Sequence, residues 1–198
     1  MIPKQERLAN ALKAKTDERA GEVLNFNEAK VKQRAKTVGH LLRREGEPAR
    51  VVVTGGAGAG KSSFAGSLSD VLDVPVFDFD KYIQGGFTPD VEEYESRLNS
   101  AVYDLWSDLP KSDTGYIIEH VEACNPTLIR MLNPNFAVLL DPGEDHLKRT
   151  AKVRNEVGTY NRSREKRALD SMKTSRKHFE AAPGNIVMKD GGILVKKL

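Results

Sequence analysis

The chain has 198 residues, of which 39% are hydrophobic and 30% are charged, and its formal net charge is +3 at pH 7. This length allows one α/β domain with a buried core and a small appendage. No apolar run reaches the roughly 20 residues that cross a bilayer, and the first residues lack the apolar segment of a secretory signal. A single cysteine, Cys124, excludes an internal disulfide framework. We therefore expect a soluble, cytoplasmic protein in which Cys124 is a buried thiol.

The charged residues are distributed unevenly along the chain. Residues 1–50 carry 12 Lys/Arg and 7 Asp/Glu, residues 51–147 carry 5 and 16, and residues 148–177 carry 11 and 3. An acidic middle segment therefore lies between two basic segments. Because basic segments attract polyanions, we expect nucleotide phosphates or a nucleic-acid backbone among the partners of this chain.

Residues 1–47 are predicted to form a basic, helical N-terminal extension, separate from a core over residues 48–198. Within the extension, Asn27 is a candidate N-cap of a helix and Gly46 is a candidate C-cap. The excess of Lys and Arg in this extension indicates either an arm that binds a partner or a solvent-exposed helical surface.

From Arg50 onward, β-rich runs alternate with helical stretches. The runs predict strands at Val51–Thr54, Val74–Phe79, Tyr116–Glu119, Phe136–Asp141 and Asn185–Met188, with Ile193–Lys197 as a short edge strand. Helices are predicted near residues 61–72, 90–108, 126–133, 144–157 and 163–181. Strands separated by helices indicate βαβ units, and hence a parallel sheet that is covered on both faces.

After the first predicted strand, the sequence GGAGAGKS fills the phosphate-loop pattern G-x-x-x-x-G-K-[ST]. Glycines let the backbone fold around a phosphate with several N–H groups pointing toward it. We expect Lys61 to reach the β- and γ-phosphates and the Ser62 hydroxyl to ligate Mg²⁺. The predicted nucleotide-binding residues are Gly55, Gly56, Ala57, Gly58, Ala59, Gly60, Lys61, Ser62 and Ser63.

The second predicted strand ends in VPVFDFDKY. Because side chains alternate along a strand, Asp78 and Asp80 are predicted to share one face at its carboxyl end, where α/β sheets bind ligands. Asp80 is the candidate for the group that accepts or orients the proton of an acceptor hydroxyl. Asp78 is a candidate for the Mg²⁺ shell or for an acceptor contact. The alternative for either carboxylate is a cap on the following helix.

The next two strands end in further polar residues. Glu119 closes the third strand and is a candidate to hold the Mg²⁺ shell. His120 follows it, either as a substrate contact or as a structural histidine. Asp141 closes the fourth strand and is a weaker candidate, because the sequence DPGED also fits a turn and a helix start.

An Arg-rich segment, residues 146–167, follows the fourth strand. It includes Arg149 and Arg154, and Gly158-Thr159 is its predicted hinge. Arginines that close over a γ-phosphoryl group stabilise its negative charge, and closure excludes water from the reaction. We therefore interpret this segment as a lid; the alternative is a solvent-exposed helical surface with ion pairs.

The order of these motifs resembles that in the P-loop kinase group. It is a phosphate loop, the DFDKY sequence, a strand ending in Glu119 and then an Arg-rich lid. That group includes nucleoside, nucleoside-monophosphate, shikimate and polynucleotide kinases. The resemblance covers about residues 50–188. It implies a three-layer α/β fold with a five-stranded parallel sheet, in which the second and third strands lie to one side of the loop strand. It also implies ATP and Mg²⁺ as cofactors, and Asp80, Lys61, Arg149 and Arg154 as catalytic residues.

The residues around these motifs indicate which kind of group accepts the phosphate. The Arg that monophosphate kinases carry at the corresponding strand end is missing after Glu119, where HVEAC stands, and this favours a hydroxyl acceptor. No N-K-x-D motif is present, which weakens a GTPase interpretation. The basic segments favour an acceptor within a nucleic acid. In these respects the chain is similar to phage kinases that phosphorylate 5-hydroxymethyluracil within DNA, with polynucleotide 5′-hydroxyl kinases close to them. Tyr82, Phe87 and Tyr160 are candidates for stacking on an extruded base.

Two alternative functions fit the same sequence. The first is a kinase of a free nucleoside or of another small hydroxylated metabolite, which needs only a compact acceptor pocket. The second is a protein without catalytic activity, in which ATP binding switches the affinity of the N-terminal extension for a partner. No local pattern identifies the acceptor pocket or the oligomeric state, and we expect no membrane partner.

Overall fold

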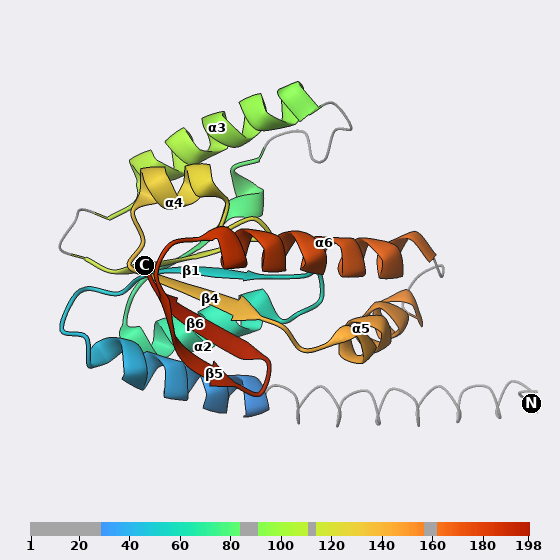
Figure 1. Cartoon of the computed structure of the whole chain (residues 1–198), viewed down its shortest axis with the longest axis horizontal. Coiled ribbons are helices and arrows are strands. Elements are labelled where there is room, and N and C mark those ends of the chain that lie inside the picture. The colour runs from blue at the N-terminus through green and yellow to red at the C-terminus, as the bar shows by residue number, and fades with distance from the viewer. Residues whose placement is uncertain (1–28, 84–90, 111–113, 157–161) are drawn as a thin grey trace, which may run out of the picture.

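The computed structural model describes residues 29–83, 91–110, 114–156 and 162–198, in which a six-stranded sheet lies between two layers of helices (Figure 1). In chain order, the strands are β1 (Arg50–Gly55), β2 (Val76–Asp78), β3 (Tyr116–Glu119), β4 (Phe136–Leu140), β5 (Asn185–Asp190) and β6 (Ile193–Lys197). Their order across the sheet is β2-β3-β1-β4-β6-β5. The strands β2, β3, β1 and β4 are parallel, whereas β6 runs antiparallel to both β4 and β5.

The sheet departs from the prediction at its C-terminal end. It has six strands rather than five, and β6 lies between β4 and β5 instead of at an edge. The buried Lys196 of β6 contacts the end of the preceding helix, where its Nζ donates to the carbonyl oxygens of Phe179 at 2.8 Å and Ala182 at 2.7 Å. A cation at the carboxyl end of a helix satisfies its last carbonyl groups, so this lysine fixes β6 against the end of the preceding helix.

The helices lie close to where the sequence predicts them. The N-terminal helix (residues 29–43) precedes the sheet, and α2 (Lys61–Leu72), the 3₁₀ turn η1 (Phe79–Lys81), α3 (Val91–Asp108), α4 (Pro126–Leu132), α5 (Glu144–Glu156) and α6 (Arg162–Ala181) follow. Local sequence sets several of their ends. The Asn125 side chain accepts the Thr127 N–H at 2.9 Å and caps α4. Gly46, at φ +74°, follows the turn that ends the N-terminal helix, while the candidate cap Asn27 lies outside the described residues.

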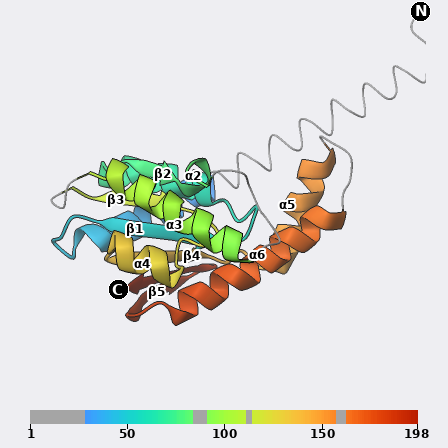
Figure 2. The same ribbon diagram turned by 90° about the horizontal axis from the view of Figure 1, so that it is seen from above.

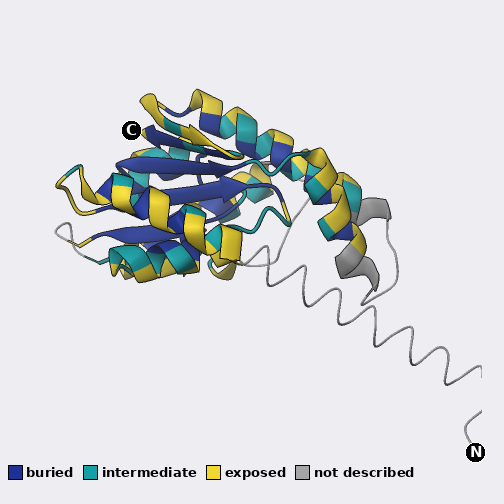
Figure 3. Cartoon of the chain, turned by 90° about the horizontal axis from the view of Figure 1, so that it is seen from below, coloured by how far each residue is buried: buried dark blue, intermediate teal, exposed yellow. Residues whose placement is uncertain are grey.

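Alternation of side chains along β1 divides the core into two layers. Val52 packs in the layer of α3, α4 and α6, whereas Val51 and Val53 pack in the layer of α2 and the N-terminal helix. Figure 1 shows these helices on opposite sides of the sheet, and Figure 3 shows the central strands buried between them. The three-layer α/β fold expected from the sequence is confirmed, and so is the position of β2 and β3 on one side of β1.

The N-terminal helix contributes to the hydrophobic core. Ala35, Val38 and Leu42 are spaced three and four residues apart, and all three are fully buried in the layer that also contains α2. Burying a valine or leucine side chain contributes about 1.5–3 kcal/mol to folding. The helix is therefore packed as part of the sheet's covering layer, while the predicted domain boundary at residue 47 stays a prediction.

The composition led to two expectations, that Cys124 is buried and that no segment spans a membrane. Cys124 is fully buried, as predicted, and burial raises the pKa of its thiol to about 12, so this cysteine is a packing residue rather than a reactive one. Within the part of the chain that the structure describes, no helix is both long enough and apolar enough to span a bilayer.

Candidate active site

The phosphate loop has the strand–loop–helix context that its sequence predicts. It leaves β1 at Gly55 and enters α2 at Lys61. Its backbone passes through the left-handed region at Gly58 (φ +85°) and Gly60 (φ +88°), where any other side chain would be strained. The Gly60 carbonyl accepts the Phe64 N–H at 2.9 Å and opens α2. A glycine loop that leads into a helix N-terminus is an arrangement suited to binding phosphate.

The structure brings together Ser62 and Glu119, two of the predicted Mg²⁺ ligands. The Ser62 hydroxyl donates to Glu119 Oε1 at 2.6 Å. Glu119 ends β3, the neighbour of β1, and is only 7% exposed. Hydroxyl and carboxylate oxygens are ligands that Mg²⁺ prefers, and this ion commonly takes its remaining ligands from substrate phosphates and water. The described residues contain no group of three or more His, Cys, Asp or Glu that could hold a metal alone. The Ser62–Glu119 pair therefore fits a Mg²⁺–nucleotide complex.

The strand that carries the two aspartates is shorter than predicted. It ends at Asp78, and the next three residues form η1, so the expectation that Asp78 and Asp80 share a strand face is wrong. Instead, Asp78 Oδ1 accepts the Asp80 N–H at 3.1 Å and caps the 3₁₀ turn. In the parallel register of β2 and β3, Asp78 pairs with Glu119. The role of Asp78 in the Mg²⁺ shell stays a prediction.

The 3₁₀ turn places the Asp80 carboxylate against His120. His120 Nε2 lies 3.1 Å from Asp80 Oδ1. His120 Nδ1 accepts the backbone N–H of Glu122 at 3.1 Å, so the ring proton is on Nε2, where it is donated to Asp80. The histidine is buried and its ring lies edge-on to Phe79, whereas the Asp80 side chain is 78% exposed. A buried donor thus orients a carboxylate that is accessible from solvent.

Electrostatic interactions link Asp80 to the phosphate loop. The hydrogen bond from His120 is the main cause that holds the pKa of Asp80 below its usual value, and the positive charge of Lys61 acts in the same direction. Lys61 Nζ also donates to the carbonyl oxygen of Gly56 at 3.4 Å. The charge of the predicted phosphate-binding lysine therefore acts on the Asp80 carboxylate, although less strongly than the hydrogen bond from His120.

Tyr94 and Glu122, which no sequence motif marks, form a pair near enough to Asp80 for its charge to act on Tyr94. Tyr94 Oη, from α3, donates to Glu122 Oε2 at 3.0 Å. Burial and the negative charges of Glu122 and Asp80 raise the pKa of the Tyr94 phenol. Other charged residues of α3 are mainly acidic: Glu92, Glu93, Glu95, Asp104 and Asp108, with one arginine, Arg97. No motif marks the contact between Tyr94 and Glu122, because it joins two elements that are distant in sequence.

Helix α6 packs directly on the phosphate loop. No sequence motif predicted this contact. Ser171 Oγ accepts the Ala57 N–H at 2.8 Å, and Met172 Sδ accepts the Gly56 N–H at 3.2 Å. A Cβ on Gly56 would lie 2.9 Å from the carbonyl oxygen of Ala168. Since α6 also contains the end of the predicted lid, one helix joins the lid to the loop.

The predicted lid, residues 146–167, comprises most of α5 and the start of α6, which extend beyond the sheet in Figure 2. Thr150 lies near the loop, because a Cβ on Gly58 would be 3.2 Å from Thr150 Cγ2. Arg149 is exposed, and its Nε donates to a backbone carbonyl of the preceding turn at 3.2 Å. The Arg154 side chain and the predicted hinge lie outside the described residues, so the roles of these arginines stay predictions.

Two other candidates make contacts that connect elements of the fold. Tyr82 Oη donates to a carboxylate of α3 at 2.9 Å, and burial is the main cause that raises its pKa to about 12. Asp141 accepts two hydrogen bonds from Arg176 of α6, at 2.8 and 2.7 Å. Phe87 and Tyr160 lie outside the described residues, and base stacking by the three aromatic candidates stays a prediction.

Comparisons with known proteins find likeness in structure. No protein-family model and no curated protein sequence matches the chain. A gluconokinase from Sinorhizobium meliloti 1021 matches with 17% identity and a TM-score of 0.46, over 63% of this chain and 75% of that chain. A shikimate kinase from Acinetobacter baumannii in complex with shikimate matches with 20% identity and a TM-score of 0.46, over 73% and 86%. A shikimate kinase from Bacteroides thetaiotaomicron matches with 19% identity and a TM-score of 0.44, over 68% and 82%. These values are too low to carry an activity to this chain.

Proposed function

We propose that this chain is an ATP-dependent kinase that transfers the γ-phosphoryl group of ATP to a hydroxyl group. The observation that carries the proposal is the exposed Asp80 carboxylate, which the buried His120 orients and on which the charge of Lys61 acts. A phosphate loop alone would serve any nucleotide-binding protein. An oriented carboxylate beside that loop is the group that a hydroxyl acceptor requires.

In the proposed reaction, the acceptor oxygen forms a bond to the γ-phosphorus while the bond from that phosphorus to the β–γ bridging oxygen breaks, and ADP leaves. Asp80 orients the acceptor hydroxyl and receives its proton. Lys61 and the N–H groups of the loop stabilise negative charge on the β- and γ-phosphates. Ser62 and Glu119 would hold Mg²⁺, which neutralises phosphate charge when it is bound.

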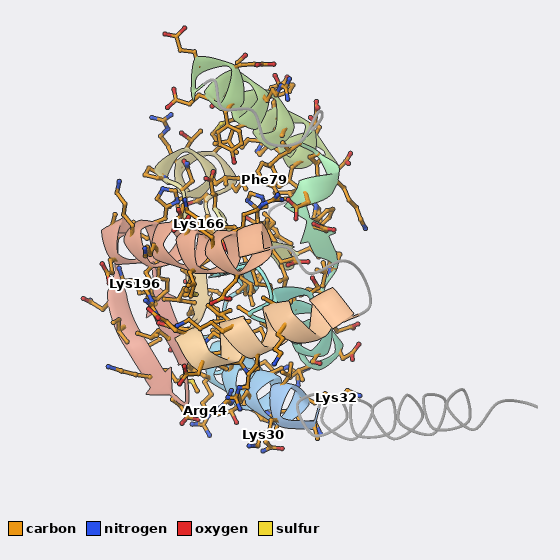
Figure 4. The ribbon with its side chains drawn as sticks, turned by 90° about the vertical axis from the view of Figure 1, so that its right-hand side faces the viewer. Lys30, Lys32, Arg44, Phe79, Lys166 and Lys196 are labelled. Atoms are coloured by element: carbon orange, nitrogen blue, oxygen red, sulfur yellow. The ribbon has the colours of Figure 1, made fainter. Side chains whose placement is uncertain are left out.

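Within this class, we propose that the acceptor is a hydroxyl of a nucleoside unit in DNA, such as the hydroxymethyl group of 5-hydroxymethyluracil. Basic surfaces support this choice. The N-terminal helix carries five Lys/Arg and no Asp/Glu, and Lys148, Arg149 and Lys152 are exposed on α5. Figure 4 shows Lys30 and Lys32 on the described part of the N-terminal helix, at the end of the molecule where α5 lies. Such a surface favours binding to a DNA backbone.

A second candidate acceptor is a free nucleoside or another small, uncharged hydroxylated metabolite. The acidic character of α3 favours it, because this helix has five acidic residues and one arginine, and its Tyr94 is bonded to a further carboxylate, Glu122. These charges oppose the approach of a phosphate backbone from that side. A small neutral acceptor encounters no such repulsion.

Incubation of the full chain with Mg²⁺, γ-labelled ATP and separate acceptors tests the proposal. The panel contains DNA with 5-hydroxymethyluracil, 5′-hydroxyl oligonucleotides, free nucleosides and small hydroxylated metabolites. We expect label in a hydroxylated acceptor, and for DNA a KM that rises steeply with salt concentration because counterions are released on binding. Labelling of small acceptors alone, with little salt dependence, would select the second candidate. Bound ATP with no labelled product from any acceptor would contradict the kinase assignment and favour an ATP-switched binding protein.

A further inference from the structure

Two buried hydroxyl groups meet at one carbonyl oxygen in the turn that follows His120. Thr54 Oγ1, near the end of β1, donates to the carbonyl oxygen of Val121 at 2.6 Å, and Ser175 Oγ of α6 lies 2.8 Å from the same oxygen. Both side chains are fully buried. Ser175 Oγ also lies 3.0 Å from the carbonyl oxygen of Ser171, so its one proton is shared between two acceptors. Thr54 is therefore the stronger donor to this turn.

The carbonyl that these hydroxyls hold belongs to the same peptide unit as the N–H that fixes His120. The peptide between Val121 and Glu122 has its oxygen on the two hydroxyls, and its N–H donates to His120 Nδ1 at 3.1 Å. Because a peptide unit is planar, holding its oxygen also sets the direction of its N–H. Rotation of this peptide within the turn would break the hydroxyl contacts together with the bond to Nδ1. The two hydroxyls therefore oppose that rotation.

The same contacts continue to the proposed catalytic carboxylate. With Nδ1 of His120 occupied by a donor, the ring proton is on Nε2 and is donated to Asp80 Oδ1 at 3.1 Å. Hydrogen bonds in a chain polarise one another, so a carbonyl that accepts hydroxyl protons makes the N–H of its peptide a stronger donor. If that N–H turned away, the ring proton would no longer be confined to Nε2, and Asp80 would lose its donor for part of the time.

Both hydroxyls come from elements that also hold the phosphate loop. Thr54 directly precedes Gly55, the first glycine of the loop. Ser175 lies one turn along α6 from Ser171, whose hydroxyl accepts the Ala57 N–H of the loop. The turn that orients the proposed base is thus tied to the same strand and the same helix that fix the phosphate loop.

We propose that Thr54 and Ser175 are positioning residues for phosphoryl transfer. They act through the Val121–Glu122 peptide, which keeps the ring proton of His120 on the nitrogen that faces Asp80. The inference rests on the proposed function, in which this carboxylate receives the proton of the acceptor hydroxyl. Loss of either hydroxyl lowers the rate of transfer and leaves ATP binding unchanged, because both side chains are buried away from the nucleotide.

Matched substitutions separate the hydroxyl of Thr54 from the rest of its side chain. Thr54→Val keeps the shape and removes the hydroxyl, whereas Thr54→Ser keeps the hydroxyl; Ser175→Ala removes the second donor. Thr174→Val is the control, because this threonine lies on the same helix and donates only within it, to the Asp170 carbonyl oxygen at 3.2 Å. The single-turnover rate of transfer from γ-labelled ATP and Kd for ATP are measured for each full-length variant, alone and combined with His120→Leu. Thermal unfolding verifies that each variant is folded.

We expect Thr54→Val to lower the rate of transfer by roughly tenfold, since small displacements of a reacting group are costly. Ser175→Ala should lower it less, because the proton of this serine is shared. Kd for ATP should change by less than about twofold in both variants, and Thr54→Ser and Thr174→Val should retain most of the wild-type rate. Beside His120→Leu, Thr54→Val should have less than about a twofold effect, because the residue through which it acts is absent.

Nitrogen NMR spectra of the His120 ring report its tautomer without any transfer, at about pH 8, where an imidazole is ordinarily neutral. Comparison with His120→Leu assigns the signals, and Thr54→Val should show both tautomers where the wild-type chain shows the proton on Nε2. Three results would each overturn the inference: an unchanged tautomer in Thr54→Val, equal losses of rate in Thr54→Val and Thr54→Ser, or an undiminished effect beside His120→Leu. Absence of transfer by the wild-type chain would instead contradict the proposed function, and the tautomer comparison does not depend on that outcome.

Discussion

His120 donates its Nε2 proton to Asp80 Oδ1 at 3.1 Å, from a buried ring whose other nitrogen accepts the Glu122 N–H. Without that donor, an exposed aspartate on a short 3₁₀ turn would sample several rotamers. With it, one carboxylate oxygen is held by the histidine, which leaves the other to face an acceptor. This contact joins the 3₁₀ turn after β2 to the residue that follows β3, and it holds an exposed carboxylate in one orientation.

If this orientation matters for transfer, His120→Leu should lower kcat by roughly 10- to 100-fold, because misplaced reacting groups lose the advantage of positioning. The KM for ATP should stay nearly unchanged, since His120 does not belong to the phosphate loop. His120→Gln, which retains an N–H donor, should recover much of the lost rate. Steady-state kinetics of both variants checks this. An equal loss in the two variants, or a rise confined to the KM for ATP, would count against a positioning role.

The contact between Ser62 and Glu119 predicts a change in metal dependence. Ser62→Ala and Glu119→Gln should each raise the Mg²⁺ concentration for half-maximal activity by roughly tenfold, because each removes an oxygen ligand or its charge. A titration of activity against Mg²⁺ measures this shift. Ser67→Ala, further along α2, should leave the titration unchanged. If all three variants titrate like the wild-type chain, the predicted Mg²⁺ ligands are wrong.

Packing of the N-terminal helix predicts a large effect on stability. Leu42 is fully buried, and Leu42→Ala should lower the free energy of unfolding by about 3 kcal/mol through lost burial and a residual cavity. His40→Ala, at an exposed position on the same helix, should change it by less than about 0.5 kcal/mol. Urea denaturation measures both variants. Similar, small effects in the two would show that this helix is not packed into the core.

The ion pair between Asp141 and Arg176 predicts a stability difference that depends on pH. The hydrogen bonds from Arg176 are the main cause that holds the pKa of Asp141 below its usual value. A lowered pKa stabilises the fold above the unfolded-state pKa of about 3.9, and that stabilisation is lost as the pH falls through the folded-state pKa. Asp141→Asn should therefore be less stable than the wild-type chain by about 1 kcal/mol at pH 7, with the difference shrinking below about pH 4. A constant difference from pH 7 to pH 3 would argue against the ion pair as its source.

Local sequence patterns were sufficient to predict most elements of the fold and the phosphate loop. The strand Tyr116–Glu119 and the helix Lys61–Leu72 have the predicted bounds, because hydrophobic periodicity and the glycine loop are encoded in neighbouring residues. The segment that contains Asp78 and Asp80 was harder to predict. The same residues fit either a continued strand with alternating side chains or a turn capped by Asp78. In the structure Asp78 caps a turn.

Contacts between distant parts of the chain could not be predicted in this way. The insertion of β6 between β4 and β5 depends on pairing with both strands, and it brings Lys196 to the end of α6, a partner that no local pattern specifies. The contact of His120 with Asp80 and the hydrogen bond from Ala57 to Ser171 likewise join elements that meet only in the folded chain. The acceptor side of the site is built from contacts of this kind.

In the proposed reaction, the Asp80 carboxylate accepts or orients the proton of the acceptor hydroxyl. Single-turnover transfer from γ-labelled ATP, measured beside ATP binding in the wild-type chain and in Asp80→Asn, tests it most directly. Transfer should fall by roughly 100-fold or more in the variant, while Kd for ATP should change by less than about twofold. Transfer at a near-wild-type rate by Asp80→Asn would contradict it.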